Sequence, residues 1–258
     1  MNISKTQTVR PLIVEFIGLP GAGKTTVSRR VVSELVSAGH KCLTRDVWAE
    51  LRRDHRRYPR VSLKDVYQFF VFCVRHMQVA FYALSYAFQV TPLNMRTLRK
   101  GVIFMRKLYK LKKIVREAAR WGYDIVFFDQ GLMLYVSWFA VPGSPPPDIS
   151  LIRLLKSVSG EMPQAFVLVD VDVPTAIERI TKRSTMRFFE MRGISSPESV
   201  LGRYEGYVQN IVNCAAQLNG ACRLLSVNGN DDVGEIASSI VRFINEIWQT
   251  PARRTSEL

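Results

Sequence analysis

The sequence has few cysteines, and none of them stands in a paired arrangement. The four, Cys42, Cys73, Cys214 and Cys222, are scattered without a C-x-x-C pair or a histidine at metal-ligand spacing. Zinc sites and disulfide frameworks depend on such arrangements, so this spacing indicates neither. We interpret the cysteines as reduced core thiols of a cytoplasmic protein.

Long apolar runs are also missing. The N-terminal segment MNISKTQTVRPL has no signal-peptide core, so we expect no export. The most apolar stretch, residues 66–90, is interrupted by Arg75 and His76, whereas a membrane span needs about 20 consecutive apolar residues. We expect a buried helix there, whose aromatic side chains either pack in the core or stack on a base or sugar.

Acidic residues are scarce in one part of the chain. The net charge of +14 divides into +3 for residues 1–40, +14 for residues 41–120 and −3 for residues 121–258. The middle block therefore favours a polyanionic partner, which leaves a phosphate-bearing substrate, acidic membrane lipid and nucleic acid open. A solvated helix surface would have the same composition.

The remaining pattern predicts an α/β fold of one domain over residues 1–258, because buried strands of a parallel sheet read as apolar runs separated by helices. With 47% hydrophobic residues, the chain has enough apolar side chains for a full core. The five predicted strands cover residues 12–17, 41–44, 125–129, 165–171 and 222–227.

Two features of the predicted connections stand out. The first helix begins at Lys24 and ends near Gly39, a residue suited to a helix C-terminus. About 80 residues then separate the second and third strands, far more than a loop needs. We expect a basic helical insertion over about 50–120, including an amphipathic helix over 95–120 with Val102 on its apolar face.

Residues 18–25, GLPGAGKT, match the phosphate-binding pattern G-x-x-x-x-G-K-[ST] at every defined position. The match lies between a predicted strand and a predicted helix, as a P-loop (Walker A motif) requires. Glycines let backbone N–H groups surround phosphate oxygens, and the helix N-terminus adds positive potential. Lys24 is predicted to contact the β- and γ-phosphates of ATP, and Thr25 to bind Mg²⁺.

Further site residues follow the other strands. Asp129 ends the third strand and is a second predicted Mg²⁺ ligand. An arginine-rich lid over about 179–195 would neutralise the transferred phosphoryl group, with Arg183 and Arg187 as its main participants. The predicted nucleotide contacts are Gly18, Pro20, Gly21, Ala22, Gly23, Lys24, Thr25, Thr26, Arg179 and Asn228.

Two assignments stay open. Asp46, after the second strand, is either a catalytic base or a helix cap. The Asn228 turn, N-G-N-D, either wraps a purine through backbone groups or is an ordinary turn before the last helix. The predicted catalytic set is Lys24, Asp46, Asp129, Arg183 and Arg187.

These motifs together resemble the thymidylate kinase and deoxynucleoside kinase group of the nucleoside monophosphate kinase-like proteins. The resemblance covers the chain outside the insertion, and only its P-loop is highly specific. It implies a three-layer P-loop NTPase fold with a parallel five-stranded sheet, and it matches Arg179 and Arg183 to the R-x-x-x-R of the lid. Two departures, Gln130 in place of an arginine and Val47 in place of a proline, do not favour thymidine as substrate.

The leading hypothesis is an ATP- and Mg²⁺-dependent kinase that phosphorylates a nucleoside or nucleoside monophosphate. The alternatives are a kinase of a sugar, polyol, antibiotic or lipid-linked acceptor, and a nucleotide-driven switch that binds an anionic partner. A nucleic-acid partner is not expected, because the apolar half of the insertion looks like core. Peripheral membrane contact through the basic insertion and a homodimer stay open.

Overall fold

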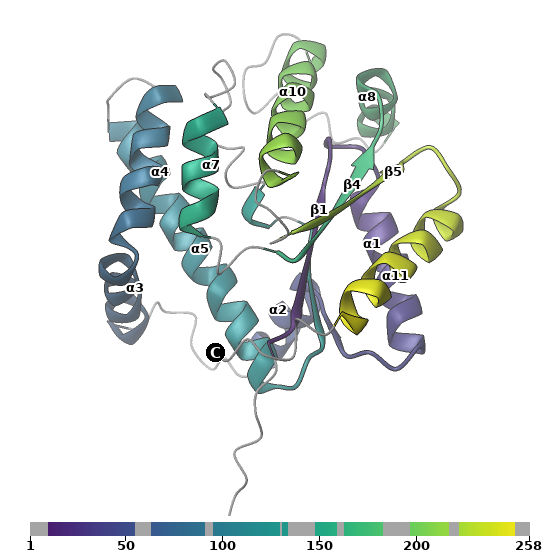
Figure 1. Ribbon diagram of the computed structural model, residues 1–258, viewed down its shortest axis with the longest axis horizontal. Helices are drawn as coiled ribbons and strands as arrows, with labels where there is room; N and C mark the ends of the chain where they lie inside the picture. The colour runs from purple at the N-terminus through teal and green to yellow at the C-terminus, as the bar shows by residue number, and fades with distance from the viewer. Residues whose placement is uncertain are drawn as a thin grey trace, which may run out of the picture.

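The structure is a computed structural model of the 258-residue chain. It describes residues 10–54, 63–90, 95–129, 131–133, 148–158, 163–182, 197–216 and 222–250. In this part of the chain, helices surround a single parallel sheet, an α/β arrangement in layers (Figure 1).

The sheet has five strands in the order β2-β3-β1-β4-β5, and all neighbouring strands are parallel. Their bounds are β1 Leu12–Ile17, β2 Cys42–Leu43, β3 Ile125–Phe128, β4 Ala165–Asp170 and β5 Arg223–Asn228. The five predicted strands are confirmed, with ends that differ by at most one residue. β1 lies in the centre of the sheet, so the segments that follow β1, β3 and β4 meet at the same edge.

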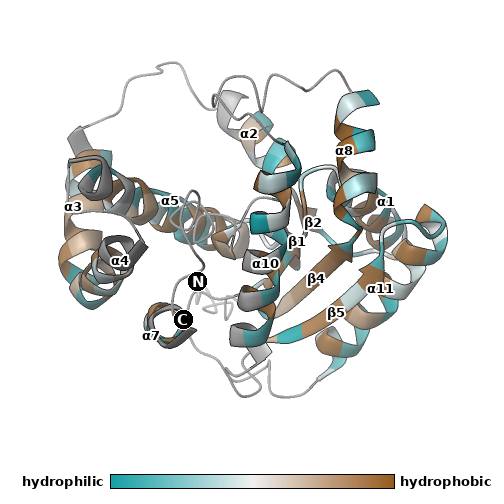
Figure 2. Ribbon diagram, turned by 90° about the horizontal axis from the view of Figure 1, so that it is seen from above, coloured by the Kyte–Doolittle hydropathy of each residue, from teal (hydrophilic) through white to brown (hydrophobic). Residues whose placement is uncertain are grey.

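Successive side chains of β1 enter different cores, because they alternate between the two faces of the sheet. Leu12, Val14 and Phe16 belong to a core cluster with helices α1 and α11. Ile13 and Ile17 face the other side, where the larger group of helices lies. Figure 2 shows the sheet, from above, between these two groups.

The helices divide accordingly. On one face lie α1 (Lys24–Ser37) and α11 (Val233–Gln249). The other face carries α5 (Met95–Arg120), α7 (Asp148–Ser157) and α10 (Pro197–Ala216). At the carboxyl end of the sheet, α2 (Arg45–Asp54) follows β2 and α8 (Val173–Lys182) follows β4. The predicted start of α1 is confirmed, and Gly39 has the left-handed φ of 94° expected beyond the end of that helix.

The insertion between β2 and β3 is helical, as predicted, but the prediction of one buried helix over residues 66–90 is wrong in two respects. The segment forms two helices, α3 (Leu63–Arg75) and α4 (Met77–Val90), which meet at His76. Tyr67 and Phe70 are 69% and 65% exposed. α4 packs on α5 and α7 with one side only, and this leaves apolar side chains on the opposite side in contact with solvent.

The helix predicted over 95–120 is confirmed as α5, with one error in its apolar face. Val102 is 58% exposed, and Phe104 is buried in its place. Phe104 lies with Met105 and Leu108 in the core cluster that α5 shares with α3, α4 and α7. The side chain's position on the helix, rather than its hydropathy, decides which of the two is buried.

The described cysteines are free thiols, and burial raises their pKa. The pKa is about 12 for Cys42 and about 11 for Cys222. Such thiols stay protonated and unreactive at neutral pH, consistent with packing residues. The side chain of Cys214 lies outside the described part. Of the helices that the structure describes, none is apolar over a length that could cross a bilayer.

Candidate functional site

The glycine-rich loop, residues 18–25, joins β1 to α1 and takes backbone conformations that only glycine adopts readily. Gly18, Gly21 and Gly23 have φ values of 138°, 86° and 91°. A Cβ atom on Gly18 would lie 2.3 Å from the carbonyl oxygen of Val169, and one on Gly21 would lie 2.5 Å from that of Ala176. The loop therefore follows its path because these three residues lack side chains.

The N-terminus of α1 opens directly out of this loop. Gly23 is its N-cap residue and makes no side-chain capping bond, and the first turn contains no acidic residue. The first N–H groups of a helix have no carbonyl partner within the helix, and the helix dipole makes this end positive. Backbone donors and positive potential together suit an anion such as phosphate.

Lys24 adds a charge to this helix end. Its Nζ atom donates hydrogen bonds to the carbonyl oxygens of Gly18 and Leu19, at 2.9 and 2.7 Å. Burial lowers the pKa of Lys24 from 10.5 to about 8, and the negative charge of Asp129 opposes part of that shift. Lys24 is thus a desolvated cation close to a carboxylate that follows a different strand.

A cavity of about 210 Å³ lies beside the loop and is lined by three of the predicted site residues. Thr25, Asp46 and Asp129 all line it, although they follow three different strands. Sequence reasoning missed the other polar residues of this cavity, which lie on α1 and at the start of α2: Ser28, Arg29, Thr44 and Arg45. A hydroxyl and carboxylates that share one cavity are oxygen ligands of the kind that Mg²⁺ prefers.

The structure bears on the open assignment of Asp46. α2 begins at Arg45, and the backbone N–H of Val47 donates to Oγ1 of Thr44 at 3.3 Å. The capping bond at this helix start is therefore made by Thr44. Asp46 lies in the first turn, is exposed and lines the cavity.

Arg179 and the turn after β5 contact each other close to the glycine-rich loop. The guanidinium group of Arg179 donates to the carbonyl oxygen of Gly229, at 3.1 Å, and to Oδ1 of Asn230, at 3.0 Å. A Cβ atom on Gly229 would lie 3.0 Å from the carbonyl oxygen of Ala22. Two predicted nucleotide contacts, Arg179 and the turn that begins at Asn228, are thus adjacent to the glycine-rich loop.

Glu15 is a supporting residue that sequence reasoning missed. It lies in β1, has no exposed surface, and its Oε1 atom accepts a hydrogen bond of 2.8 Å from the backbone N–H of Met133. A Cβ atom on Gly131 would lie only 2.5 Å from the carboxyl carbon of Glu15. The carboxylate therefore holds the chain just beyond Asp129, and the signal for it was the single charged residue in the apolar strand LIVEFI.

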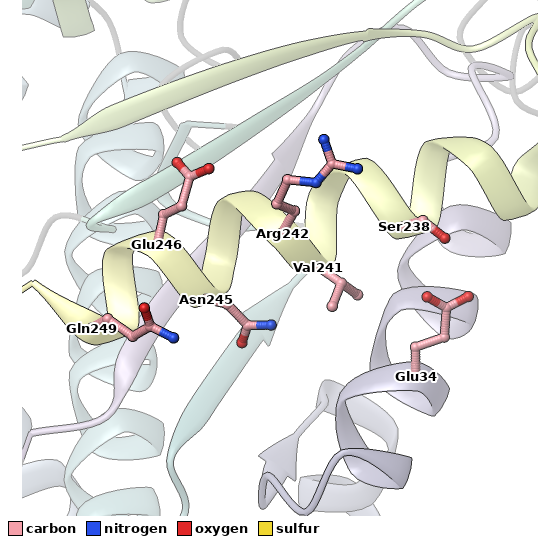
Figure 3. A pocket seen from close by; sticks show the side chains of 7 residues that line it. All are labelled: Glu34, Ser238, Val241, Arg242, Asn245, Glu246 and Gln249. Carbon is pink, nitrogen blue, oxygen red and sulfur yellow. The ribbon is translucent and has the colours of Figure 1, made fainter.

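Another hollow, of about 430 Å³, runs along α11 and includes Glu34 of α1 (Figure 3). Its volume alone would favour it as a binding site. None of the predicted site residues lines it, however, and its lining comes from exposed and half-buried positions of two helix surfaces. We assign the site to the smaller cavity because it lies at the carboxyl ends of the strands, where ligands of open parallel sheets bind.

Arg183 and Arg187, the main predicted lid residues, lie outside the described residues, as does Gln130. Only the first four residues of the predicted lid, 179–182, are described. Within the described ranges, no group of three or more histidine, cysteine or acidic side chains forms a metal cluster.

In comparisons with known proteins, no family model matches this chain and no curated protein is detectably similar to it.

Proposed function

We propose that the protein is an ATP- and Mg²⁺-dependent phosphotransferase with a three-layer P-loop NTPase fold, acting on a small acceptor in the cavity beside the glycine-rich loop. The observation that carries the proposal is the meeting of Lys24, Thr25 and Asp129 at the uncapped end of α1. Phosphoryl transfer needs mainly positioning and neutralisation of charge, and these residues offer both.

Each residue has a role in this proposal. The backbone N–H groups of the loop and the Lys24 ammonium group hold the phosphates of ATP. Thr25 and Asp129 would hold Mg²⁺, which neutralises negative charge on the phosphates when it is bound. Arg183 and Arg187 would neutralise the transferred group from the lid.

Asp46 is proposed as the base that accepts the proton of the acceptor hydroxyl. Its support is the capping bond made by Thr44, which makes a capping role for Asp46 unnecessary, together with its place in the cavity lining. Asp46→Asn should lower kcat by roughly 10²- to 10⁴-fold, the usual contribution of a general base. The matched control is Glu50→Gln, an exposed carboxylate on the same helix that does not line the cavity.

The proposed acceptor is a nucleoside or nucleoside monophosphate, on the strength of the motif resemblance. The decisive experiment incubates the protein with ATP and Mg²⁺ against nucleosides, nucleoside monophosphates, sugars and polyols, and measures ADP release. A kinase consumes ATP only with its acceptor present. Slow hydrolysis that no acceptor stimulates, with partner affinity that depends on the nucleotide, would instead favour the switch.

A further inference from the structure

The insertion carries a set of exposed apolar side chains that the proposed reaction does not use. Of the eleven large hydrophobic residues that are exposed in the described ranges, six lie between residues 66 and 81. We call them the α3–α4 stripe; their exposed fractions run from 52% to 69%, and they are Val66, Tyr67, Phe70, Val74, Met77 and Phe81. Soluble monomers rarely expose an apolar patch of this kind without an interaction partner.

The stripe lies along one side of two consecutive helices. The spacing of residues 66, 70, 74, 77 and 81 keeps side chains on the same helix face. The backbone hydrogen bonds continue through the junction, since His76 donates to the carbonyl oxygen of Phe72 and accepts from the N–H of Ala80. On the opposite side, Val79 and Ala83 are buried.

The location of the two helices leaves this side accessible. α3 and α4 form the left edge of the molecule in Figure 1, away from β5 and α11. Their inner contacts are to α5 and, for α4, to α7. The stripe therefore lies away from the cavity at Thr25, and it is free to act independently of the reaction there.

Charge indicates what covers the stripe. Arg75 at the end of α3 is exposed and lies in the sequence between Val74 and Met77 of the stripe. The whole segment 41–120 carries a net charge of +14. Two copies that met through this surface would bring like charges together, whereas an anionic bilayer would attract them.

We infer that the α3–α4 stripe docks the protein on an anionic membrane surface. Helices with aromatic and aliphatic side chains on one face and basic residues beside it lie in the plane of the lipid headgroups. The apolar side chains enter the boundary between headgroups and acyl chains, and Arg75 remains near the lipid phosphates. No membrane span is involved in this arrangement.

The experiment is sedimentation of the full chain with vesicles of phosphatidylcholine alone or mixed with phosphatidylserine. The protein should bind the mixed vesicles at least about tenfold more tightly, and salt should weaken this binding. The double variant Phe70→Gln/Phe81→Gln should lose at least about tenfold in affinity, because burial of each phenylalanine drives insertion. Arg75→Gln should lose about fivefold on mixed vesicles only.

The matched control is Val36→Gln, which replaces a side chain that is 53% exposed on α1 and should leave vesicle binding unchanged. Circular dichroism melts verify that each variant is folded. Failure of the wild type to bind mixed vesicles, or equal binding by the double variant, overturns the inference. A dimer that the double variant loses, without vesicle binding, assigns the stripe to a second copy and also overturns it. Since no turnover is measured, the result does not depend on the proposed activity.

Discussion

Two helices of this molecule begin in opposite ways. At the start of α11, the side chain of Asp232 accepts hydrogen bonds from the N–H groups of Gly234 and Glu235, at 2.8 and 3.2 Å, and Glu235 adds a negative charge to the first turn. At the start of α1, Gly23 has no capping side chain and the first turn has no acidic residue.

The N-terminus of α11 is built for helix stability, whereas the N-terminus of α1 suits an anion. α11 satisfies its own first donors, so its N-terminus has little left to offer a ligand. α1 has no capping side chain at its positive dipole end, and Lys24 strengthens the same field. Four experiments test this contrast.

The largest effect should come from Lys24→Ala. If Lys24 contacts the phosphates as proposed, loss of this cation should reduce turnover by roughly 10³-fold, the effect of losing one preorganised electrostatic contact in an enzyme. The fold should remain, because the substitution removes a desolvated charge whose burial is itself unfavourable. ADP release and a thermal melt measure the two quantities. Lys156→Ala, at an exposed lysine of α7 outside the proposed site, is the control; similar turnover in both variants would contradict the assignment.

The second experiment is the pH dependence of ATP affinity. The pKa of Lys24 is lowered to about 8, so the ammonium group is charged below that pH and progressively loses its proton above it. Affinity for ATP should therefore fall above pH 8, by up to about tenfold per pH unit. Calorimetric titrations between pH 7 and 9.5 measure this.

The same pKa also affects the free protein. A lysine whose pKa is lower in the folded state than in the unfolded state binds fewer protons when folded. Its unfavourable contribution to folding stability is therefore fully present below pH 8 and is relieved between pH 8 and 10.5.

The control for the ATP titration is Lys24→Arg. In this variant the cation stays charged throughout, so the decline in ATP affinity above pH 8 should disappear. A decline that persists in this variant would assign the titration to another group.

The third experiment compares the two glycines that flank α1, Gly23 before it and Gly39 beyond its end. Gly23 and Gly39 have φ values of 91° and 94°, and an added Cβ atom would meet nothing within 4 Å at either. Alanine should therefore destabilise the fold by about 1 to 2 kcal/mol at both positions, through the backbone alone. Only Gly23→Ala should also weaken ATP binding, by roughly tenfold, since it disturbs the donors of the loop. Equal affinities for the two variants would remove the anion-binding role from this helix end.

The smallest effect should come from Asp232→Ala. Loss of the two capping bonds should cost about 1 kcal/mol of stability. In a chain of this size that lowers the melting temperature by about 2 to 4 °C. ATP affinity should be unchanged. Differential scanning calorimetry with and without ATP measures both, and a loss of affinity here would mean that the two helix starts are not functionally distinct.

The sheet could be predicted from the sequence because its strands are apolar runs that end in polar or glycine residues. Every residue of β1 and β3 is buried, because helices cover both faces of the sheet. Such strands appear in the sequence as nearly continuous apolar runs and are easy to recognise. The convergence of Thr25, Asp46 and Asp129 followed from the rule that parallel strands end at one edge.

Other features could not be predicted because they depend on distant neighbours. Hydropathy alone did not separate the exposed Val102 from the buried Phe104, since only the packing of α5 decides between them. The exposed side of α3 and α4 was assigned to the core for the same reason. Glu15 was visible as a charged residue in an apolar strand, but its partner, the N–H of Met133, is 118 residues away.

The insertion enters and leaves the sheet through β2 and β3, which are adjacent at one margin of it. Both ends of the insertion are thus attached to the sheet side by side, on two paired strands. A change in the length or packing of the insertion therefore need not alter the order of the strands or move Lys24.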